Sequence, residues 1–336
     1  MGTTLATGPR LGCAAIALLS VAFLLCGSVA VTYAQHTPRV LIGVLDTNSR
    51  DTVRAGLWDL FKDRLRELGY VERQTVEFDF RWGDGNSEVL PDLARQLVER
   101  KVSAIVTAGT PAAFAASQAT STIPIVMATG TSVGTGLADA SAKIQNVTGM
   151  SDMPAGLSAR RLELIKEALP KASTFAVLSD EANPASPVAV REIEQAARAL
   201  GVEIKVYGVR SPSDFKNAAS TMKQDGVGGV LVLPGAMFFG QRKALAALAI
   251  EHKMPTLFVR GEYVEAGGLI SYGASIQDNY RRAATYVDKI LKGAKPSELA
   301  VDEVSEFELV INLKTAQAIG VAIAPSLLER ARKIDR

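Results

Sequence analysis

Cysteine and histidine are scarce in this sequence of 336 residues, which contains two of each. Both cysteines, Cys13 and Cys26, fall in an apolar N-terminal run, so the rest of the chain has no thiolate nucleophile, disulfide or cysteine metal site. His36 and His252 are far apart, and His252 ends a predicted helix, where it meets the helix dipole. We therefore expect no metal, no cofactor and no enzymatic activity.

The sequence also lacks a dominant charge. Its net charge is +2, and no long run carries one sign. This gives no electrostatic argument for binding nucleic acid or an anionic membrane. The composition, 48% hydrophobic and 21% charged, is that of a globular protein, and the length predicts about two domains.

One long hydrophobic run is present, at the N-terminus. Arg10 precedes the apolar stretch 11–31, and "TYAQ" follows it. This order is typical of a secretory signal, so we predict a signal peptide over residues 1–34, cleaved after Ala34. An uncleaved membrane anchor and a lipid on Cys26 are the alternatives. The expected location of the mature protein is the periplasm.

From Arg39 onward, apolar strands and helices alternate. The run "RVLIGVLD" is a buried strand, and "DTVRAGLWDLFKDRLRELG" follows with apolar residues at helical spacing up to Gly69. Continuous apolar strands separated by helices indicate parallel sheets covered on both faces. The fold class is α/β, with doubly wound parallel sheets.

The alternation restarts after Gly149, and the two halves resemble one another. "SAIVTAGTPAAF" parallels "GGVLVLPGAMFF", and "IPIVMA" parallels "MPTLFV". The interval from Gly69 to Pro124 is one residue longer than that from Gly201 to Pro255. We infer two similar lobes, one over 38–148 with 276–304 and the other over 149–273 with 305–336.

Phosphate-binding motifs are missing. There is no G-x-x-x-x-G-K-[ST], and the first strand lacks the G-x-G-x-x-G fingerprint. The segment "GTSVGTG" (130–136) offers backbone amides for an anion, but a turn is the simpler interpretation. "DGNSE" (84–88) is too short for a calcium loop.

Polar and aromatic residues gather at the predicted strand ends, where ligands bind in open α/β sheets. Each alone is explained equally well by capping or turn chemistry. Together they offer amides and hydroxyls for a carboxylate, an acid for an ammonium group and rings for an apolar side chain. The candidate ligand-binding residues are Asp46, Asn48, Trp82, Gly109, Thr110, Thr129, Gly130, Asp180, Asn183, Met237, Phe238, Arg260 and Tyr272.

The C-terminal part carries a family resemblance. The phrases "RRAATYVDKILKGAKP", "FELVINLKTAQAIG" and "PSLLERA", with "LRELGYVE" and "ARQLVERKVSAIVTAGTPAA" earlier, resemble the periplasmic substrate-binding proteins of ABC transporters, in the branch with tryptophan- and tyrosine-binding members. The resemblance covers essentially everything after the signal. It implies a type I periplasmic-binding fold, a three-segment hinge near 146–152, 272–275 and 304–307, and a membrane permease with its ATPase as partners.

The resemblance also implies closure on a ligand by hinge motion. We expect a monomer that binds a small molecule, best an amino acid or aromatic carboxylate. Amides near Thr110 and Thr129 would hold a carboxylate, Asp180 would face an ammonium group, and Trp82 would be quenched more than Trp58.

Two other functions remain open from sequence alone. A periplasmic sensor docking on a signalling receptor needs the same closing cleft. An exported enzyme would use carboxylates such as Asp46 and Asp180, for which no activating partner is visible. A gene regulator is disfavoured because no helix-turn-helix precedes Arg39.

Overall fold

The computed structural model describes residues 1–4, 39–131, 135, 137 and 146–334. The chain divides into two compact units, Met1–Pro38 and Arg39–Arg336, and every helix and strand discussed below belongs to the second. Most of the predicted signal peptide, both cysteines, His36 and much of the 130–136 segment lie outside the described residues. Within the described ranges, no helix is both long enough and apolar enough to cross a bilayer.

The first sheet has six strands in the order β11-β5-β4-β3-β1-β2, and each pair of adjacent strands is parallel. Its strands are β1 (Val40–Asp46), β2 (Val76–Trp82), β3 (Ala104–Ala108), β4 (Ile125–Thr129), β5 (Val147–Ser151) and β11 (Asp302–Glu303). Strands β3, β4 and β5 are buried along their whole length, as expected for a sheet covered on both faces.

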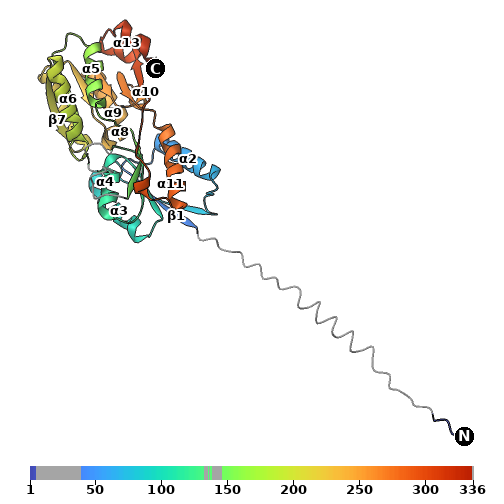
Figure 1. Ribbon diagram of the computed structural model, residues 1–336. Helices are drawn as coiled ribbons and strands as arrows, with labels where there is room; N and C mark the ends of the chain where they lie inside the picture. The colour runs from blue at the N-terminus through green and yellow to red at the C-terminus, as the bar shows by residue number, and fades with distance from the viewer. Residues whose placement is uncertain (5–38, 132–134, 136, 138–145, 335–336) are drawn as a thin grey trace. The chain divides into compact units, whose positions relative to one another are not determined.

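In the described part of the chain, four helices accompany the first sheet. They are α2 (Thr52–Glu67), α3 (Leu90–Glu99), α4 (Thr110–Ala119) and α11 (Gln277–Leu291), with a short 3-10 turn η1 (Ser87–Val89) before α3. Helix α11 comes from late in the chain, yet it lies beside α2, near the start (Figure 1). Tyr280, Ala283 and Val287 of α11 enter one core with Trp58 and Phe61 of α2. The first lobe is thus completed by a distant segment.

The second sheet has seven strands in the order β13-β12-β10-β9-β8-β6-β7. They are β6 (Thr174–Asp180), β7 (Glu203–Val209), β8 (Gly229–Val232), β9 (Thr256–Phe258), β10 (Ile270–Gly273), β12 (Glu308–Asn312) and β13 (Arg332–Ile334). The order β7-β6-β8-β9-β10 repeats β2-β1-β3-β4-β5 of the first sheet, so the predicted pair of similar α/β lobes is confirmed.

The second sheet departs from the expectation at one edge, where β12 runs antiparallel to β10. Strand β12 is reached from the first lobe through a short crossing. It therefore enters the second sheet without the helical crossover that a parallel connection needs.

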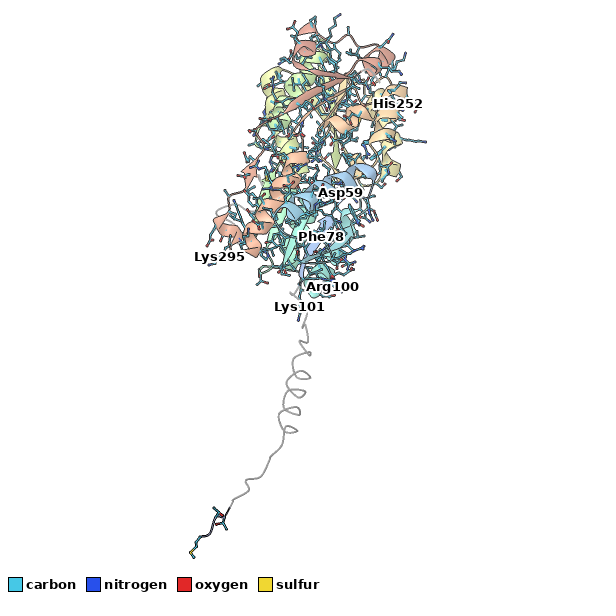
Figure 2. All side chains as sticks on the ribbon, turned by 90° about the vertical axis from the view of Figure 1, so that its right-hand side faces the viewer. Asp59, Phe78, Arg100, Lys101, His252 and Lys295 are labelled. Atoms are coloured by element: carbon cyan, nitrogen blue, oxygen red, sulfur yellow. The ribbon has the colours of Figure 1, made fainter. Side chains whose placement is uncertain are left out.

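The second lobe carries the helices α5 (Leu157–Ala168), α6 (Ser186–Leu200), α7 (Phe215–Gln224), α8 (Ala236–Gly240), α9 (Arg242–Glu251), α10 (Gly261–Glu265), α12 (Leu313–Ile319) and α13 (Pro325–Arg330). Two 3-10 turns are η2 (Pro212–Asp214) and η3 (Pro296–Glu298), the latter next to β5 of the first sheet. Helix α6 ends at Gly201, which adopts the left-handed conformation typical of a helix stop. His252 caps the C-terminus of α9, as its position in the sequence suggested (Figure 2).

The described chain passes between the two sheets three times. The passages follow β5, β10 and β11, over residues 152–156, 274–276 and 304–307. Two glycines border these passages at close backbone approaches. A Cβ on Gly149 would lie 2.3 Å from the Met127 carbonyl oxygen, and one on Gly273 would lie 1.8 Å from that of Val259. The segments next to the crossings are therefore built backbone against backbone.

Candidate functional site

Both sheets change winding direction at the strand next to one edge. In the first sheet β1 lies between β2 and β3, and in the second β6 lies between β7 and β8. The carboxyl ends of strands at such a switch point form the usual ligand crevice of open α/β sheets. Here the residues after the ends of β1, β3, β6 and β8 line two cavities, which share Asn48, Ala236 and Phe239.

The inner cavity has a volume of about 60 Å³ and is lined from both lobes. The first lobe contributes Asn48, Arg54, Gly109, Thr110, Pro111, Thr129 and Gly130, and the passage after β5 contributes Asp152 and Met153. The second lobe contributes Asn183, Pro234, Gly235, Ala236, Phe239, Val259, Arg260 and Tyr263. Arginines, hydroxyls and a helix start therefore surround a space of head-group size.

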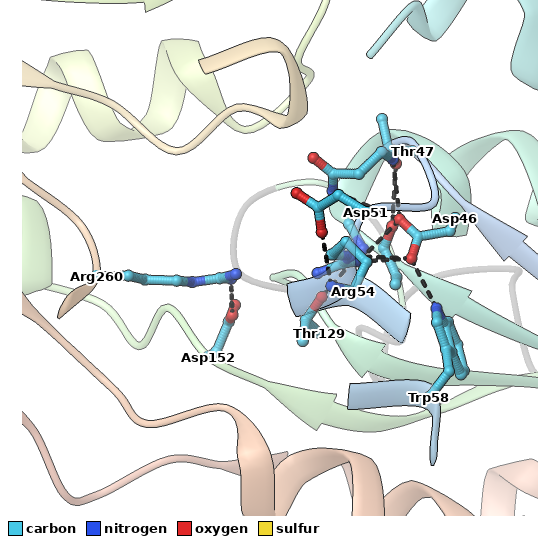
Figure 3. A network of polar contacts seen from close by, with 11 residues as sticks. Asp46, Thr47, Asp51, Arg54, Trp58, Thr129, Asp152 and Arg260 are labelled. Atoms are coloured by element: carbon cyan, nitrogen blue, oxygen red, sulfur yellow. Dashed lines mark hydrogen bonds and ion pairs between the residues drawn. The ribbon is translucent and has the colours of Figure 1, made fainter. Parts of the chain in front are cut away.

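Asp46 lies at the centre of a buried network rather than in a cavity lining (Figure 3). Arg54 donates to both carboxylate oxygens, at 2.7 and 2.8 Å through Nη2 and at 3.1 Å through Nε. The Trp58 indole donates at 2.8 Å and the Asn48 amide at 2.9 Å. With this many donors, Asp46 is a structural counter-ion that holds Arg54 in place.

The Arg54 guanidinium is fully charged in this setting although it is only 1% exposed. Burial alone would lower its pKa, but the attraction of Asp46 and the hydrogen bonds to it outweigh burial and raise the pKa above its usual value. Arg54 comes from the first turn of α2, whose N-cap is Asp51. The network thus fixes a permanent positive charge on the wall of the inner cavity.

A second ion pair joins the two lobes. Arg260, after β9, donates to Asp152, after β5, at 2.5 Å (Figure 3). Burial opposes the charge of Arg260, yet the neighbouring Asp152 carboxylate leaves its pKa raised. The other Asp152 oxygen accepts the Gly130 amide at 3.1 Å. Arg260 keeps further N–H donors for a ligand.

The start of α4 supplies a backbone donor to the inner cavity. Thr110 lines this cavity, and its amide has no acceptor among the described residues. By contrast, the Gly109 amide donates to Thr129 and the Gly130 amide to Asp152, so these two are already used. The positive end of α4 and the Arg260 guanidinium together suit a carboxylate.

The outer cavity is larger, about 800 Å³, and more acidic. Asp180, at the end of β6, is buried to 4% exposure and lines it. Its Oδ1 accepts the Ala182 amide at 3.0 Å, and no cation pairs with it among the described residues. Burial raises the pKa of the Asp180 carboxyl, with a smaller effect from the adjacent Glu181. Asp180 is the buried acid here without a counter-ion.

Nine of the thirteen sequence-predicted residues line these cavities. They are Asn48, Gly109, Thr110, Thr129, Gly130, Asn183 and Arg260 at the inner cavity, and Asp180 and Met237, with Asn48 again, at the outer one. Asn183 is also bound within the protein, donating to the Pro234 carbonyl at 2.7 Å.

The other four line neither cavity. Asp46 is the counter-ion described above. Trp82 stacks on Phe80, with ring centroids 5.6 Å apart. Phe238 is completely buried in the second-lobe core. Tyr272 packs against Phe307, and its carbonyl accepts Arg161 Nε at 2.8 Å. The expected aromatic wall for a ligand is therefore absent from these three positions, because their rings are taken up by core packing.

Sequence reasoning missed Arg54, Asp152, Phe239 and Tyr263. One signal could have revealed Arg54. It shares a helical face with the buried residues Trp58, Phe61 and Leu65, where an arginine needs a buried partner. The other three lie on short elements and turns whose position depends on the tertiary fold.

A sequence model of the ABC transporter substrate-binding protein family matches residues 40–335. The chain belongs to this family. Its fold is that of the type I periplasmic binding proteins, which a leucine-binding protein of Thermotoga maritima shares at 16% identity and a TM-score of 0.54, over 69% of each chain.

One protein similar to this substrate-binding protein is named for binding tyrosine, and another was crystallised with L-Trp. A tyrosine-binding protein of Clostridioides difficile is 27% identical over 77% of this chain and 75% of its own length. A Streptococcus pneumoniae ABC domain, crystallised with L-Trp, is 27% identical with a TM-score of 0.80, over 88% of this chain and 100% of that one. A Vibrio cholerae conserved domain protein is 26% identical with a TM-score of 0.78, over 88% and 99% of the two chains.

Proposed function

We propose that this substrate-binding protein is the receptor of an ABC importer and binds an amino acid between its lobes. The observation that carries the proposal is the inner cavity, which is lined both by Arg260 and by Thr110, whose amide is free at the start of α4. These donors suit a ligand carboxylate. Asp180, which lines the adjoining outer cavity without a counter-ion, suits a cationic group of the ligand. The family membership and the two aromatic amino-acid relatives support this ligand class.

Binding would act through hinge closure. The two lobes, each built on one of the two sheets, would be joined by the three passages. A ligand held by α4 in one lobe and Arg260 in the other contacts both lobes only when they are closed, so it favours the closed state. The closed form would dock on a permease driven by an ATPase. We propose an exported monomer, located in the periplasm, that binds its ligand without converting it.

A thermal-shift screen tests the ligand class. The unit Arg39–Arg336 would be melted with amino acids, sugars and purines at high concentration. A ligand at a hundred times its Kd adds about 2.7 kcal/mol to the free energy of unfolding, because it binds only the folded state. We expect amino acids to raise the Tm and sugars and purines to leave it unchanged. A shift with sugars alone would contradict the proposal.

Asp180→Asn separates binding from stability. Because burial raises the pKa of this carboxyl, its charged form opposes folding above that pKa, whereas protonation at low pH removes the penalty. At pH 7 the variant is expected to melt at or above the wild-type Tm without ligand, yet to lose the amino-acid shift. A variant that melts lower but still binds would assign Asp180 a structural role.

A further inference from the structure

The outer cavity is lined by five carboxylates. They are Asp51, Asp84, Glu88, Asp180 and Glu181, and Arg210 is the single arginine among the described residues of this lining. Both lobes contribute acids to this lining, so the fields of these charges add in the cavity. This is an electrostatic environment for a cation.

Only some of these acids are neutralised by the protein. Glu181 pairs with Arg210 at 2.6 Å, and Asp51 pairs with Arg242 at 3.0 Å. No ion pair of Asp84, Glu88 or Asp180 is found among the described residues. Asp180 is the decisive member, because it is 4% exposed, its Oδ2 has no hydrogen-bond partner in the described part of the chain, and it lines the cavity. A buried carboxylate left in this state favours an external cation.

The sizes of the two cavities indicate which part of the ligand each one can hold. The inner cavity, about 60 Å³, has room for a head group, so a side chain must extend into the outer cavity of about 800 Å³. The outer lining has one aromatic ring, Phe239, which also borders the inner cavity. Trp82, Phe238 and Tyr272 are held in packing elsewhere. The side chain therefore meets carboxylates rather than an aromatic wall.

We infer that the ligand is an amino acid with a cationic side chain, a guanidinium or a second ammonium group. This rests on the proposed function, because the carboxylate end is assigned to the inner cavity. The cationic end then lies against Asp180 and extends toward Asp84 and Glu88. A neutral side chain of the same shape leaves these acids uncompensated, and an aromatic one adds the cost of removing water from them.

Calorimetry with matched ligands tests the inference on the unit Arg39–Arg336. L-arginine and L-citrulline have nearly the same shape and differ in the side-chain charge. We expect arginine to bind about tenfold or more tightly, and this preference to shrink at high salt. Agmatine, which is arginine without its carboxylate, is expected to bind more weakly than arginine because it leaves the inner cavity unfilled.

The variant Asp84→Asn/Glu88→Gln tests the outer acids without touching the inner cavity. Asparagine tolerates the positive φ of 52° at position 84. Arginine affinity is expected to fall about threefold or more at low salt, with citrulline affinity unchanged. The control is Glu99→Gln. Glu99 lies at the C-terminus of α3, at the end of the helix away from Glu88, and next to Arg100 and Lys101 (Figure 2). It is expected to leave arginine affinity unchanged.

The results of these experiments distinguish a failure of the cationic-ligand inference from a failure of the proposed function. Tyrosine, tryptophan or citrulline binding as tightly as arginine would overturn the cationic ligand and leave an amino-acid receptor standing. Agmatine binding as tightly as arginine would overturn the carboxylate site and with it the proposed function. An absence of binding for all amino acids would overturn both.

Discussion

Asp46→Ala is expected to lower the free energy of unfolding by about 3–5 kcal/mol, because it leaves the Arg54 guanidinium buried without its counter-ion. Arg54 is 1% exposed, and the Trp58 indole loses its acceptor in the same step. Denaturant unfolding of the ligand-free protein measures the loss.

Two controls assign this loss to the buried charge. Asp63→Ala removes an acid from α2, the helix that carries Arg54. Asp63 pairs with Arg66 on the surface at 3.0 Å, and its loss should cost no more than about 1 kcal/mol. Asp46→Ala combined with Arg54→Met should recover part of the lost stability, because no unpaired charge remains. If Asp46→Ala alone loses as little free energy of unfolding as Asp63→Ala, water reaches Arg54 and solvates it.

Gly149→Ala is expected to cost on the order of 4 kcal/mol or more, and to leave little folded protein. Gly149 has a φ of 119°, and its Cβ would lie 2.3 Å from the carbonyl oxygen and 2.5 Å from the amide nitrogen of Met127. These are backbone atoms of the paired strand β4, so rotating a side chain does not relieve the contact. Soluble yield and urea unfolding would measure the effect.

Gly201→Ala is the matched control for this crowding. Gly201 also has a positive φ, 64°, but nothing lies within 4 Å of its added Cβ. Only the left-handed conformation is then penalised, at about 1–2 kcal/mol. Equal losses in the two variants would show that conformation alone, and not the contact with β4, requires glycine at position 149.

The fold was largely predictable because its signals are local. The apolar runs that became β1, β3 and β4 are continuous, and Gly69 and Gly201 mark helix ends. The antiparallel β12 was not predictable from periodicity, because its direction depends on which lobe the chain leaves. Helices α8 and α10, of five residues each, are too short to show an apolar period.

The site was predictable only down to the strand ends. Asp46 and Asp180 occupy equivalent positions, each at the end of its strand, β1 or β6, and nothing local in the sequence distinguishes them. Their difference comes from Arg54, which reaches Asp46 from the next helix, whereas Asp180 has no such partner in the described chain. Likewise, an aromatic residue such as Phe238 reads the same whether its ring faces a ligand or the core.

The packing of α11 against α2 bears on the order in which the lobes are completed. The lobe whose strands are synthesised first contains Tyr280, Ala283 and Val287, and its edge strand β11 is formed by Asp302 and Glu303. During synthesis, the apolar face of α2 therefore stays uncovered until the whole second sheet except β12 and β13 has been made. The earlier lobe is finished later, and a fragment ending at Gly273 would expose Trp58 and Phe61. Contacts between such distant segments slow folding.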